Sequence, residues 1–374
     1  MIKGNKQKKN KKIAGGISEK IAVKIITVGI GVVLIIGSLS FLQRLFMPKY
    51  MGKVVEGALI AEYYQETTKH DVIFIGDCEV YENFSPITLW ENYGITSYIR
   101  GSAQQLIWQS YYLLEETLQY EKPDVIVFNV LAMQYNEPQK EAYNRMTLDG
   151  MRWSLSKVKS IQESMLEEES FLEYLFPLLR YHSRWSELTK EDWKYLWKKD
   201  TISHNGYYMR VDVKGAAGVP PAKKLANYEF GERAYFYLDK IRLLCEKNGI
   251  ALILVKVPSI YPHWYEEWDL QMEEYAKQYG LAYFNFLELF EETGVDLSVD
   301  TYDGGLHLNL SGAEKLSKYF GKILSEEYGI LDHRGEAKYD RVWEQKIAFY
   351  YAEKEKQLAD REEYFNLIKE VPCF

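Results

Sequence analysis

The stretch DVIFIGDCEVYENFSPITLWENYG, residues 71–94, contains a strand, a sharp turn and a helix. Its opening DVIFIG is a continuous apolar run, which is typical of a parallel strand covered on both faces. Ser85 and Pro86 are residue types preferred at the N-cap and the first position of a helix, and Gly94 ends that helix. Cys78 stands at the turn, where it is either a nucleophile or a small packed residue.

The alternation of strands and helices continues along the chain. The strands are short apolar runs, and the helices between them have apolar residues at helical spacing. Repeated units of this length predict an α/β fold: a three-layer, doubly wound parallel sheet with right-handed crossovers. A long charged helix is expected at about residues 339–369. The further strands are predicted at residues 95–101, 124–131, 250–257 and 281–287.

Residues 139–226 interrupt this alternation. Most of this segment has a helical pattern rich in aromatic and charged residues, and its last part has the composition of a loop. We therefore expect one α/β domain, residues 71–138 and 227–330, with residues 139–226 inserted as a helical cap. Residues 48–70 would connect this domain to an N-terminal segment, and residues 331–374 would form a C-terminal helix.

The N-terminal segment predicts a membrane anchor. Residues 1–24 contain eight lysines and one glutamate, so this arm is strongly basic. Residues 25–42 carry no charge and are just long enough to span a hydrocarbon core of roughly 30 Å. We place a transmembrane helix at residues 25–47, and the positive-inside rule then puts the arm in the cytoplasm and the main domain outside the cell. A cleaved signal peptide is the alternative, but the apolar run is long for one and no convincing cleavage site follows it.

Composition excludes several other classes of protein. The whole chain has a net charge of −8, so the part that follows the basic arm is at −15 and lacks the basic face that nucleic acid needs. Cys78, Cys245 and Cys373 form at most one disulfide, so no disulfide framework holds the domain. No nucleotide-binding glycine motif is present, and the histidines show no metal-ligand spacing. We expect neither a metal nor an organic cofactor.

Residues able to do chemistry follow several of the predicted strands. In an open parallel sheet, ligands bind outside the carboxyl ends of the strands. A thiol, backbone N–H groups beside glycines, an amide and a histidine together supply a nucleophile, an oxyanion hole and a base. The residues expected at this edge are Asp77, Cys78, Gly101, Ser102, Asn129, Asp303 and His307.

The order of these residues resembles that of the SGNH/GDSL hydrolase family. The resemblance rests on GDC-x-V-Y at residues 76–81 and on DGGLHLN-x-SG-A-E-K at residues 303–315, and it covers about residues 70–330. Within the family, the chain is most similar to membrane-anchored, exported members of the DltD-like kind, which accompany acyl modification of cell-envelope polymers. The resemblance implies an SGNH-like, flavodoxin-like sheet and ester chemistry on an envelope polysaccharide. The implied partners are this acylated polymer and the lipid bilayer.

The resemblance also implies roles for individual residues. Cys78 occupies the position of the nucleophilic serine, His307 that of the general base, and Asp303 that of the acid that orients the base. Gly101 and Asn129 would form the oxyanion hole together with the N–H of Cys78.

Three departures from the family pattern leave a second interpretation open. The serine is a cysteine, Gly304 stands where the acid is usual, and Asn129 lies inside an apolar run. The domain would then be a catalytically inactive module that binds glycan or scaffolds a membrane O-acyltransferase. An active enzyme predicts a Cys78 thiol of depressed pKa in an open cleft, whereas a scaffold predicts a buried, inert thiol.

Aromatic residues make up 15% of the chain, and most of them are expected to pack in the core. A more specific hypothesis is that some of them line a carbohydrate groove over the strand ends. On this hypothesis Trp264, together with Asp77 and Ser102, contacts the substrate. The aromatic residues considered for the groove are Trp185, Trp193, Trp197, Tyr207, Tyr208, Tyr261, Trp264 and Trp268.

Overall fold

The computed structural model describes residues 3–48, 59–198 and 201–370, which form two compact units. Unit 1 contains residues 3–48 and 172–198, and unit 2 contains the rest of the described chain. The predicted connector therefore lies partly outside the described residues. The predicted insertion is divided, because its first part and its last part belong to unit 2 and only its middle belongs to unit 1.

Unit 2 is built on a five-stranded parallel sheet with the strand order β2-β1-β3-β4-β5. The apolar runs of the sequence predict all five strands, and the doubly wound parallel sheet is confirmed. The chain winds in one direction from β1 to β2 and in the other from β3 onward, so the strand order reverses at the carboxyl ends of β1 and β3, where ligands bind in sheets of this kind. The strands are β1 (Val72–Gly76), β2 (Ser97–Gly101), β3 (Val125–Asn129), β4 (Ala251–Lys256) and β5 (Ala282–Asn285).

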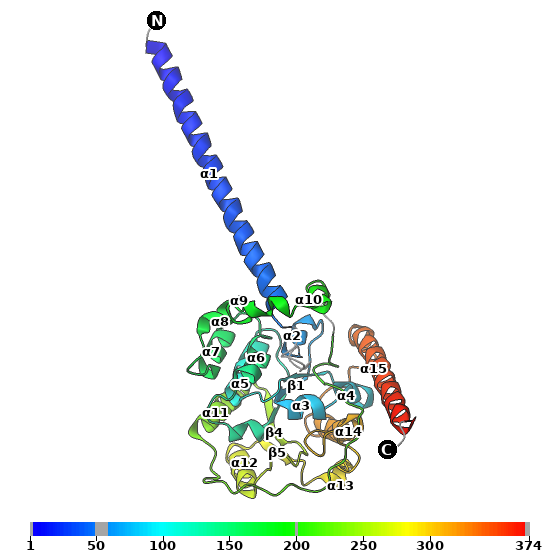
Figure 1. Ribbon diagram of the computed structural model, residues 1–374. Helices are drawn as coiled ribbons and strands as arrows, with labels where there is room; N and C mark the ends of the chain where they lie inside the picture. The colour runs from blue at the N-terminus through cyan, green and yellow to red at the C-terminus, as the bar shows by residue number, and fades with distance from the viewer. Residues whose placement is uncertain (1–2, 49–58, 199–200, 371–374) are drawn as a thin grey trace. The chain divides into compact units, whose positions relative to one another are not determined.

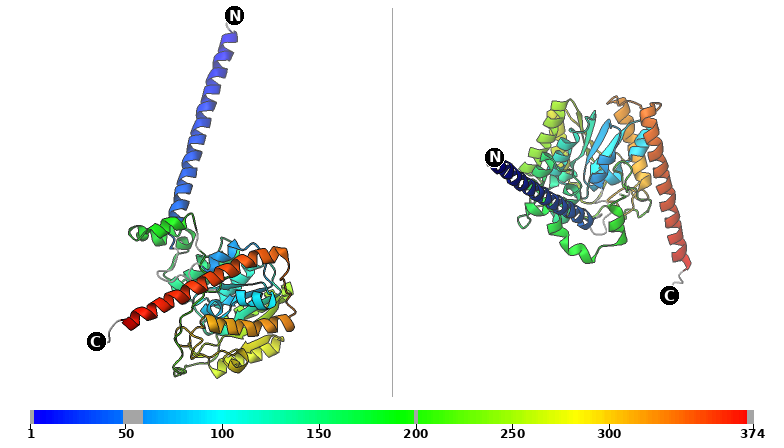
Figure 2. Two further views of the ribbon diagram at one scale, coloured as in Figure 1. Left: turned by 90° about the vertical axis from the view of Figure 1, so that its right-hand side faces the viewer. Right: turned by 90° about the horizontal axis from the view of Figure 1, so that it is seen from above.

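Two hydrophobic cores cover the two faces of this sheet (Figure 2, right). Successive side chains of β1 point to opposite faces, so Val72 and Phe74 lie in the first core and Ile73 and Ile75 in the second. The helices of the first core are α4 (Pro86–Tyr93), α14 (Leu310–Glu326) and α15 (Ala337–Glu370). Those of the second are α5 (Ile107–Thr117), α11 (Glu232–Asn248) and α12 (Glu266–Tyr279).

Helix α4 begins and ends where its sequence predicts. The Oγ atom of Ser85 accepts a hydrogen bond from the N–H of Thr88 at 3.2 Å, and Pro86 occupies the first turn. Gly94 ends the helix with a φ of +65°, which glycine adopts without a steric penalty. On the outer side of α4, the rings of Trp90 and Trp343 stack at 4.8 Å and fix α15.

Shorter helices connect these elements. Residues 201–226 contain no helix and only an isolated bridge between His204 and Tyr207, as their loop-like composition predicts. Helix α7 packs on α5, and α6 packs on α7. The short helices of unit 2 are α2 (Leu59–Glu62), η2 (Tyr63–Gln65), α3 (Cys78–Asn83), η3 (Val130–Gln134), α6 (Glu141–Leu148), α7 (Leu155–Ser164) and α13 (Phe290–Thr293).

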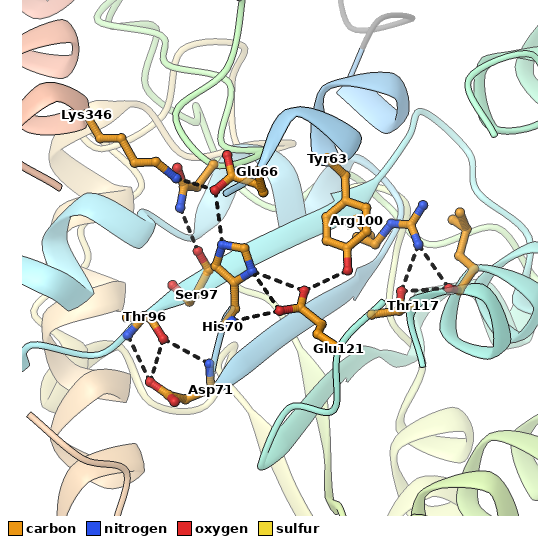
Figure 3. A network of polar contacts seen from close by, with 12 residues as sticks. Tyr63, Glu66, His70, Asp71, Thr96, Ser97, Arg100, Thr117, Glu121 and Lys346 are labelled. Atoms are coloured by element: carbon orange, nitrogen blue, oxygen red, sulfur yellow. Dashed lines mark hydrogen bonds and ion pairs between the residues drawn. The ribbon is translucent and has the colours of Figure 1, made fainter. Parts of the chain in front are cut away.

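A buried network of charged side chains lies at the amino ends of β1 and β2, the opposite edge from Cys78 (Figure 3). His70 is bonded to Glu121 at 3.1 Å and lies 3.3 Å from Glu66. Lys346 of α15 reaches the same Glu66 at 2.5 Å. Burial alone would raise the pKa of Glu66, but the hydrogen bond from His70 and the charge of Lys346 lower it to about 2. This network joins α15 to the start of the sheet.

Unit 1 consists of a long helix and a group of short ones. In α1 (Lys3–Phe46), the part from Ile21 to Phe46 is long and apolar enough to cross a membrane, and an 18-residue window within it has a mean hydropathy of 2.5. The short helices are gathered at the C-terminal end of α1 (Figures 1 and 2). They are α8 (Phe171–Leu175), α9 (Leu178–Tyr181), η4 (His182–Ser186) and α10 (Lys190–Tyr195).

Candidate active site

Cys78 lies at the carboxyl end of β1, beside the point where the strand order reverses. It is the first residue of α3, and Asp77 is the N-cap of that helix because its Oδ1 accepts a hydrogen bond from the N–H of Glu79 at 3.1 Å. Within the described chain, the N–H of Cys78 has no acceptor, as expected for the first turn of a helix. The turn after β1 therefore presents a partly exposed thiol and an available N–H side by side.

Gly101 allows the end of β2 to lie against this turn. A Cβ atom at Gly101 would come within 2.9 Å of the Val80 side chain, closer than Cβ atoms approach in proteins, and within 3.1 Å of the carbonyl oxygen of Gly76, which is also tight. Gly101 thus lies against the turn between β1 and α3, and its part in an oxyanion hole stays a prediction. The neighbouring Ser102 is fully buried, and its Oγ lies 2.5 Å from Oγ1 of Thr147. Its hydroxyl therefore interacts with another buried side chain of the protein.

His307 and Asp303 form a pair at the other side of the site. The Nδ1 atom of His307 lies 2.7 Å from Oδ2 of Asp303, while Oδ1 of Asp303 accepts the backbone N–H groups of Leu306 and His307 at 3.1 and 3.0 Å. The intervening Gly304 and Gly305 have φ angles of +92° and +102°, in the region that favours glycine. This turn lets an acid four residues before the histidine orient it.

Helix α3 also holds the histidine segment in place. The side-chain oxygen of Asn83 accepts the N–H of Leu308 at 2.7 Å, which ties the residue after His307 to the helix that begins with Cys78. Glu82 of α3 lies 3.5 Å from Nδ1 of His307 and accepts a hydrogen bond from the hydroxyl of Tyr302. The imidazole therefore faces two carboxylates, and Asn83 and Glu82 are site residues that the sequence did not reveal.

Cys78 and His307 interact electrostatically. With Nδ1 of His307 committed to Asp303, Nε2 is the nitrogen left for Cys78, and it is buried with no other partner in the described chain. Burial raises the pKa of the Cys78 thiol to about 11, although the neighbouring His307 lowers it. Burial would lower the pKa of His307, but the charges of Cys78 and Glu82 and the hydrogen bond to Asp303 raise it well above its ordinary value. The two groups therefore influence each other's protonation.

Asn129 is bonded to carboxylates. Its Nδ2 donates to Oδ1 of Asp77 at 3.0 Å and to Oε2 of Glu79 at 2.9 Å, so the amide is not directed at a ligand in this structure. Glu79 is completely buried and pairs with the equally buried Lys256 at 2.9 Å, which also donates to Ser259. Burial and the nearby Glu79 raise the pKa of Asp77 to about 7. Asp77 thus belongs to a buried polar cluster with Asn129, Glu79 and Lys256, directly before Cys78 in the chain.

The sequence contains one signal of this buried polar cluster. Lys256 is the single charge in the apolar run IALILVKV, and a charge inside a buried strand requires a buried partner. The identity of that partner could not be read, because Glu79 is 177 residues away. In sequence, Glu79 has the appearance of an ordinary residue in the first turn of a helix.

The aromatic residues considered for a groove do not form one surface. Trp264 is buried, with its indole N–H bonded to Asp269 at 3.0 Å, and Trp268 packs against it. Tyr207 is also buried, whereas Tyr208 lines a cavity described below. Trp185, Trp193 and Trp197 belong to unit 1. Trp264 therefore packs in the second core.

A cavity of about 510 Å³ adjoins the histidine. Tyr302 forms part of its wall and also lies 3.3 Å from Nδ1 of His307. The guanidinium of Arg210 stacks 4.5 Å from the centre of the Tyr302 ring, and Lys214 and Arg361 line the same cavity. Asp212 and Asp360 also line it, so the walls are polar and carry charges of both signs. Among the described residues, no group of three or more histidine, cysteine or acidic side chains could hold a metal ion.

No protein-family model and no curated protein matches the chain. Among solved structures, a proposed lipolytic protein of the G-D-S-L family from Desulfitobacterium hafniense overlaps with 68% of this chain and all of its own, at 12% identity and a TM-score of 0.35. A proposed acylhydrolase from Bacteroides fragilis overlaps with 71% of this chain and 94% of its own, at 11% identity and the same TM-score. Because a TM-score of 0.35 does not establish a shared fold, the α/β assignment rests on the strand order and register.

Proposed function

We propose that the chain is a membrane-anchored, extracytoplasmic hydrolase or acyltransferase that acts on ester-linked acyl groups through Cys78. The observation that carries this proposal is the His307 imidazole, oriented by Asp303 at 2.7 Å and interacting with a thiol at the carboxyl edge of β1. A nucleophile, a base and a group that orients the base are the parts that acyl transfer requires. The N–H groups of Cys78 and Gly101 would stabilise the oxyanion.

The reaction follows from these positions. Nε2 of His307 takes the proton of the Cys78 thiol, and the thiolate attacks the ester carbonyl, whose π electrons move to oxygen. As the tetrahedral intermediate collapses, the C–O bond breaks and the leaving alcohol takes the proton from His307. Water or a sugar hydroxyl then gives its proton to His307 and attacks the acyl-cysteine thioester, which restores the thiol. Hydrolysis and transfer differ only in this last nucleophile.

The substrate class we propose is an acylated polysaccharide of the cell envelope. The apolar part of α1 would span the membrane with the basic arm in the cytoplasm, so that unit 2 works outside the cell. The cavity beside Tyr302 has arginine, lysine and tyrosine in its walls, which suits a polar, hydroxyl-rich chain better than a free fatty acid. These features also fit the DltD-like resemblance of the sequence.

The test uses the full chain in detergent with a short-chain nitrophenyl ester. We expect release of nitrophenol and an acyl adduct on Cys78 that hydroxylamine removes, as detected by mass spectrometry. Both should disappear in Cys78→Ala and fall in His307→Ala. The matched control is Cys245→Ala, because Cys245 is buried in α11 away from the site. An adduct that persists in Cys78→Ala, or no adduct on the native chain with any acyl donor tried, would refute a cysteine nucleophile.

A second function is favoured by one observation. Burial raises the pKa of Cys78, which is the opposite of the depressed value expected for an activated thiol. We therefore keep as the alternative an inactive module that binds glycan or supports a membrane O-acyltransferase. Alkylation of Cys78 by iodoacetamide separates the two functions. Labelling at pH 7 that is faster than for a free thiol and slows in His307→Ala supports the enzyme, whereas slow labelling unchanged by the substitution supports the module.

A further inference from the structure

Unit 1 has an exposed apolar surface that the proposed reaction does not use. We call it the collar and define it as Leu175, Phe176, Leu179, Trp185, Trp193 and Trp197, which come from α8 to α10 and the segments beside them. Trp185 is 72% exposed and Trp197 is 85% exposed. Large aromatic side chains are seldom left in water at this density on a soluble surface. The collar is therefore a candidate contact surface.

The collar is attached to the end of the apolar part of α1. Helices α9 and α10 contact α1, and the ring centres of Phe41 and Trp193 lie 6.2 Å apart. Nη1 of Arg184 donates to the carbonyl oxygen of Phe46, the last residue of α1, at 2.5 Å. A cavity of about 250 Å³ lies between residues 37–44 of α1 and Trp197. The collar thus begins at the level where the apolar span of α1 ends.

This level and this composition identify the partner. Within Ile21–Phe46, no residue of the most apolar stretch is buried, and a hydrocarbon environment would cover it. At the end of such a span, tryptophan side chains settle in the headgroup layer and basic side chains reach the lipid phosphates. The collar has both, since Lys190, Lys194 and Lys198 alternate with its tryptophans. A sugar would meet stacking platforms alone, whereas a bilayer matches the apolar span, the tryptophans and the lysines together.

We propose that residues 171–198 lie in the headgroup layer of the outer leaflet and form a second membrane contact beside the transmembrane helix. The inference rests on the proposed anchoring by α1. Short helices with an apolar face and flanking lysines bind such interfaces without crossing them. Together with α1 they would hold unit 1 to the membrane by two elements, one spanning and one lying flat.

Brominated lipids provide a test, because bromine quenches tryptophan fluorescence at short range. The full chain is reconstituted into phosphatidylcholine vesicles with bromines at positions 6 and 7 or at positions 11 and 12 of the acyl chain. Helix α1 contains no tryptophan, so any quenching comes from outside the span. We expect clear quenching that is stronger with the shallow bromines. It should be largely lost in the triple variant W185F/W193F/W197F, which keeps the apolar contacts.

The control variant and the failures are distinct. Trp153 is 50% exposed but belongs to unit 2, so Trp153→Phe should leave the quenching unchanged. Chains that float with the vesicles but are not quenched would overturn the collar proposal and leave the anchor intact. Chains that do not float would refute the anchor and the collar with it. Quenching that persists in the triple variant, or is stronger with the deep bromines, would also overturn the proposal.

Discussion

Asp303 does two jobs at once in the candidate site. One carboxylate oxygen closes the turn over Leu306 and His307, and the other accepts the imidazole hydrogen bond. The sequence left open whether this aspartate is a turn residue or the partner of the histidine, and in the structure it is both. The glycines at 304 and 305 make this possible, because their positive φ angles bring an acid from an unusual spacing onto Nδ1.

The protonation of the Cys78–His307 pair predicts how activity depends on pH. With both protons bound, the pair has neither a thiolate nor a free base, so the ester reaction requires the loss of one proton. The pKa of His307 is raised well above its ordinary value and that of Cys78 is raised to about 11, so kcat/KM should increase with pH through an apparent pKa above 6.5. A pH profile of ester hydrolysis measures this. A rate that is already maximal at pH 6 would contradict it.

Asp303→Asn should act on this profile in two ways. Removal of a carboxylate that stabilises the imidazolium lowers the pKa of His307, so the rise in activity moves to lower pH. Loss of the orienting hydrogen bond should reduce the plateau of kcat/KM by about 10²- to 10⁴-fold. The control is Asp296→Asn, since the Asp296 carboxylate accepts the N–H of Ser298 instead. An unchanged profile in Asp303→Asn would show that His307 is not the base.

At the scale of elements, the buried pair Glu79–Lys256 joins the end of β4 to α3, the helix that begins with Cys78. The pair is completely buried, and Lys256 makes three further contacts that satisfy its ammonium: a second oxygen of Glu79, the carbonyl of Val257 and the hydroxyl of Ser259. A charge this deep is tolerated only while its partner is present.

Lys256→Met should therefore leave the buried Glu79 carboxylate without its countercharge. We expect the free energy of unfolding to fall by about 3–5 kcal/mol. The double variant Glu79→Gln with Lys256→Met should recover part of this loss, because it removes both charges. The control is Lys356→Met on α15, where the lysine is 67% exposed and its pair with Glu353 contributes less than about 1 kcal/mol. Urea unfolding in detergent, followed by tryptophan fluorescence, measures all three. If Lys256→Met and Lys356→Met lowered the free energy of unfolding equally, a structural role for the buried pair would be refuted.

The elements of this fold could be predicted because their signals are local. The five strands are apolar runs, and α4 is bounded by Ser85 and Gly94, so each could be read within a few residues. The site could be predicted only in part. Cys78 and His307 are marked by their motifs, but the contacts of Asn83 with Leu308 and of Glu79 with Lys256 connect residues more than 170 positions apart. Local patterns carry no information about such pairs. For the same reason, the sequence predicts ligand contacts for Asn129 and Trp264 and does not show their bonds to Asp77, Glu79 and Asp269.

At the scale of unit 2, buried carboxyl groups connect distant parts of the chain. Glu62 of α2 accepts hydrogen bonds from the N–H groups of Ile202 and Ser203 at 2.7 and 3.2 Å, which joins segments about 140 residues apart. Burial raises the pKa of Glu62 to about 7, from an ordinary value of 4.5. Its protonation is therefore linked to the stability of the folded unit.

This linkage predicts a loss of stability as pH rises. Between pH 4.5 and 7 the folded chain keeps the Glu62 proton while the unfolded chain releases it, so the free energy of unfolding should decrease by about 3 kcal/mol over this interval. Glu62→Gln keeps an acceptor and removes the titration, so its unfolding free energy should depend less on pH there. Glu344→Gln, at an exposed position on α15, should not change the slope. Parallel pH curves for Glu62→Gln and the native chain would refute the linkage.

The bond from Asn83 to Leu308 joins the Cys78 helix to a segment that is synthesised much later. Cys78 leaves the ribosome more than 200 residues before His307. At ordinary rates of about 5–20 residues per second, the thiol waits on the order of 10–50 s for its histidine. For that time it is a lone sulfhydryl without a base. Any chemistry at Cys78 is thus withheld until 307 of the 374 residues have been made, and a chain interrupted before residue 307 would carry the cysteine but no means of activating it.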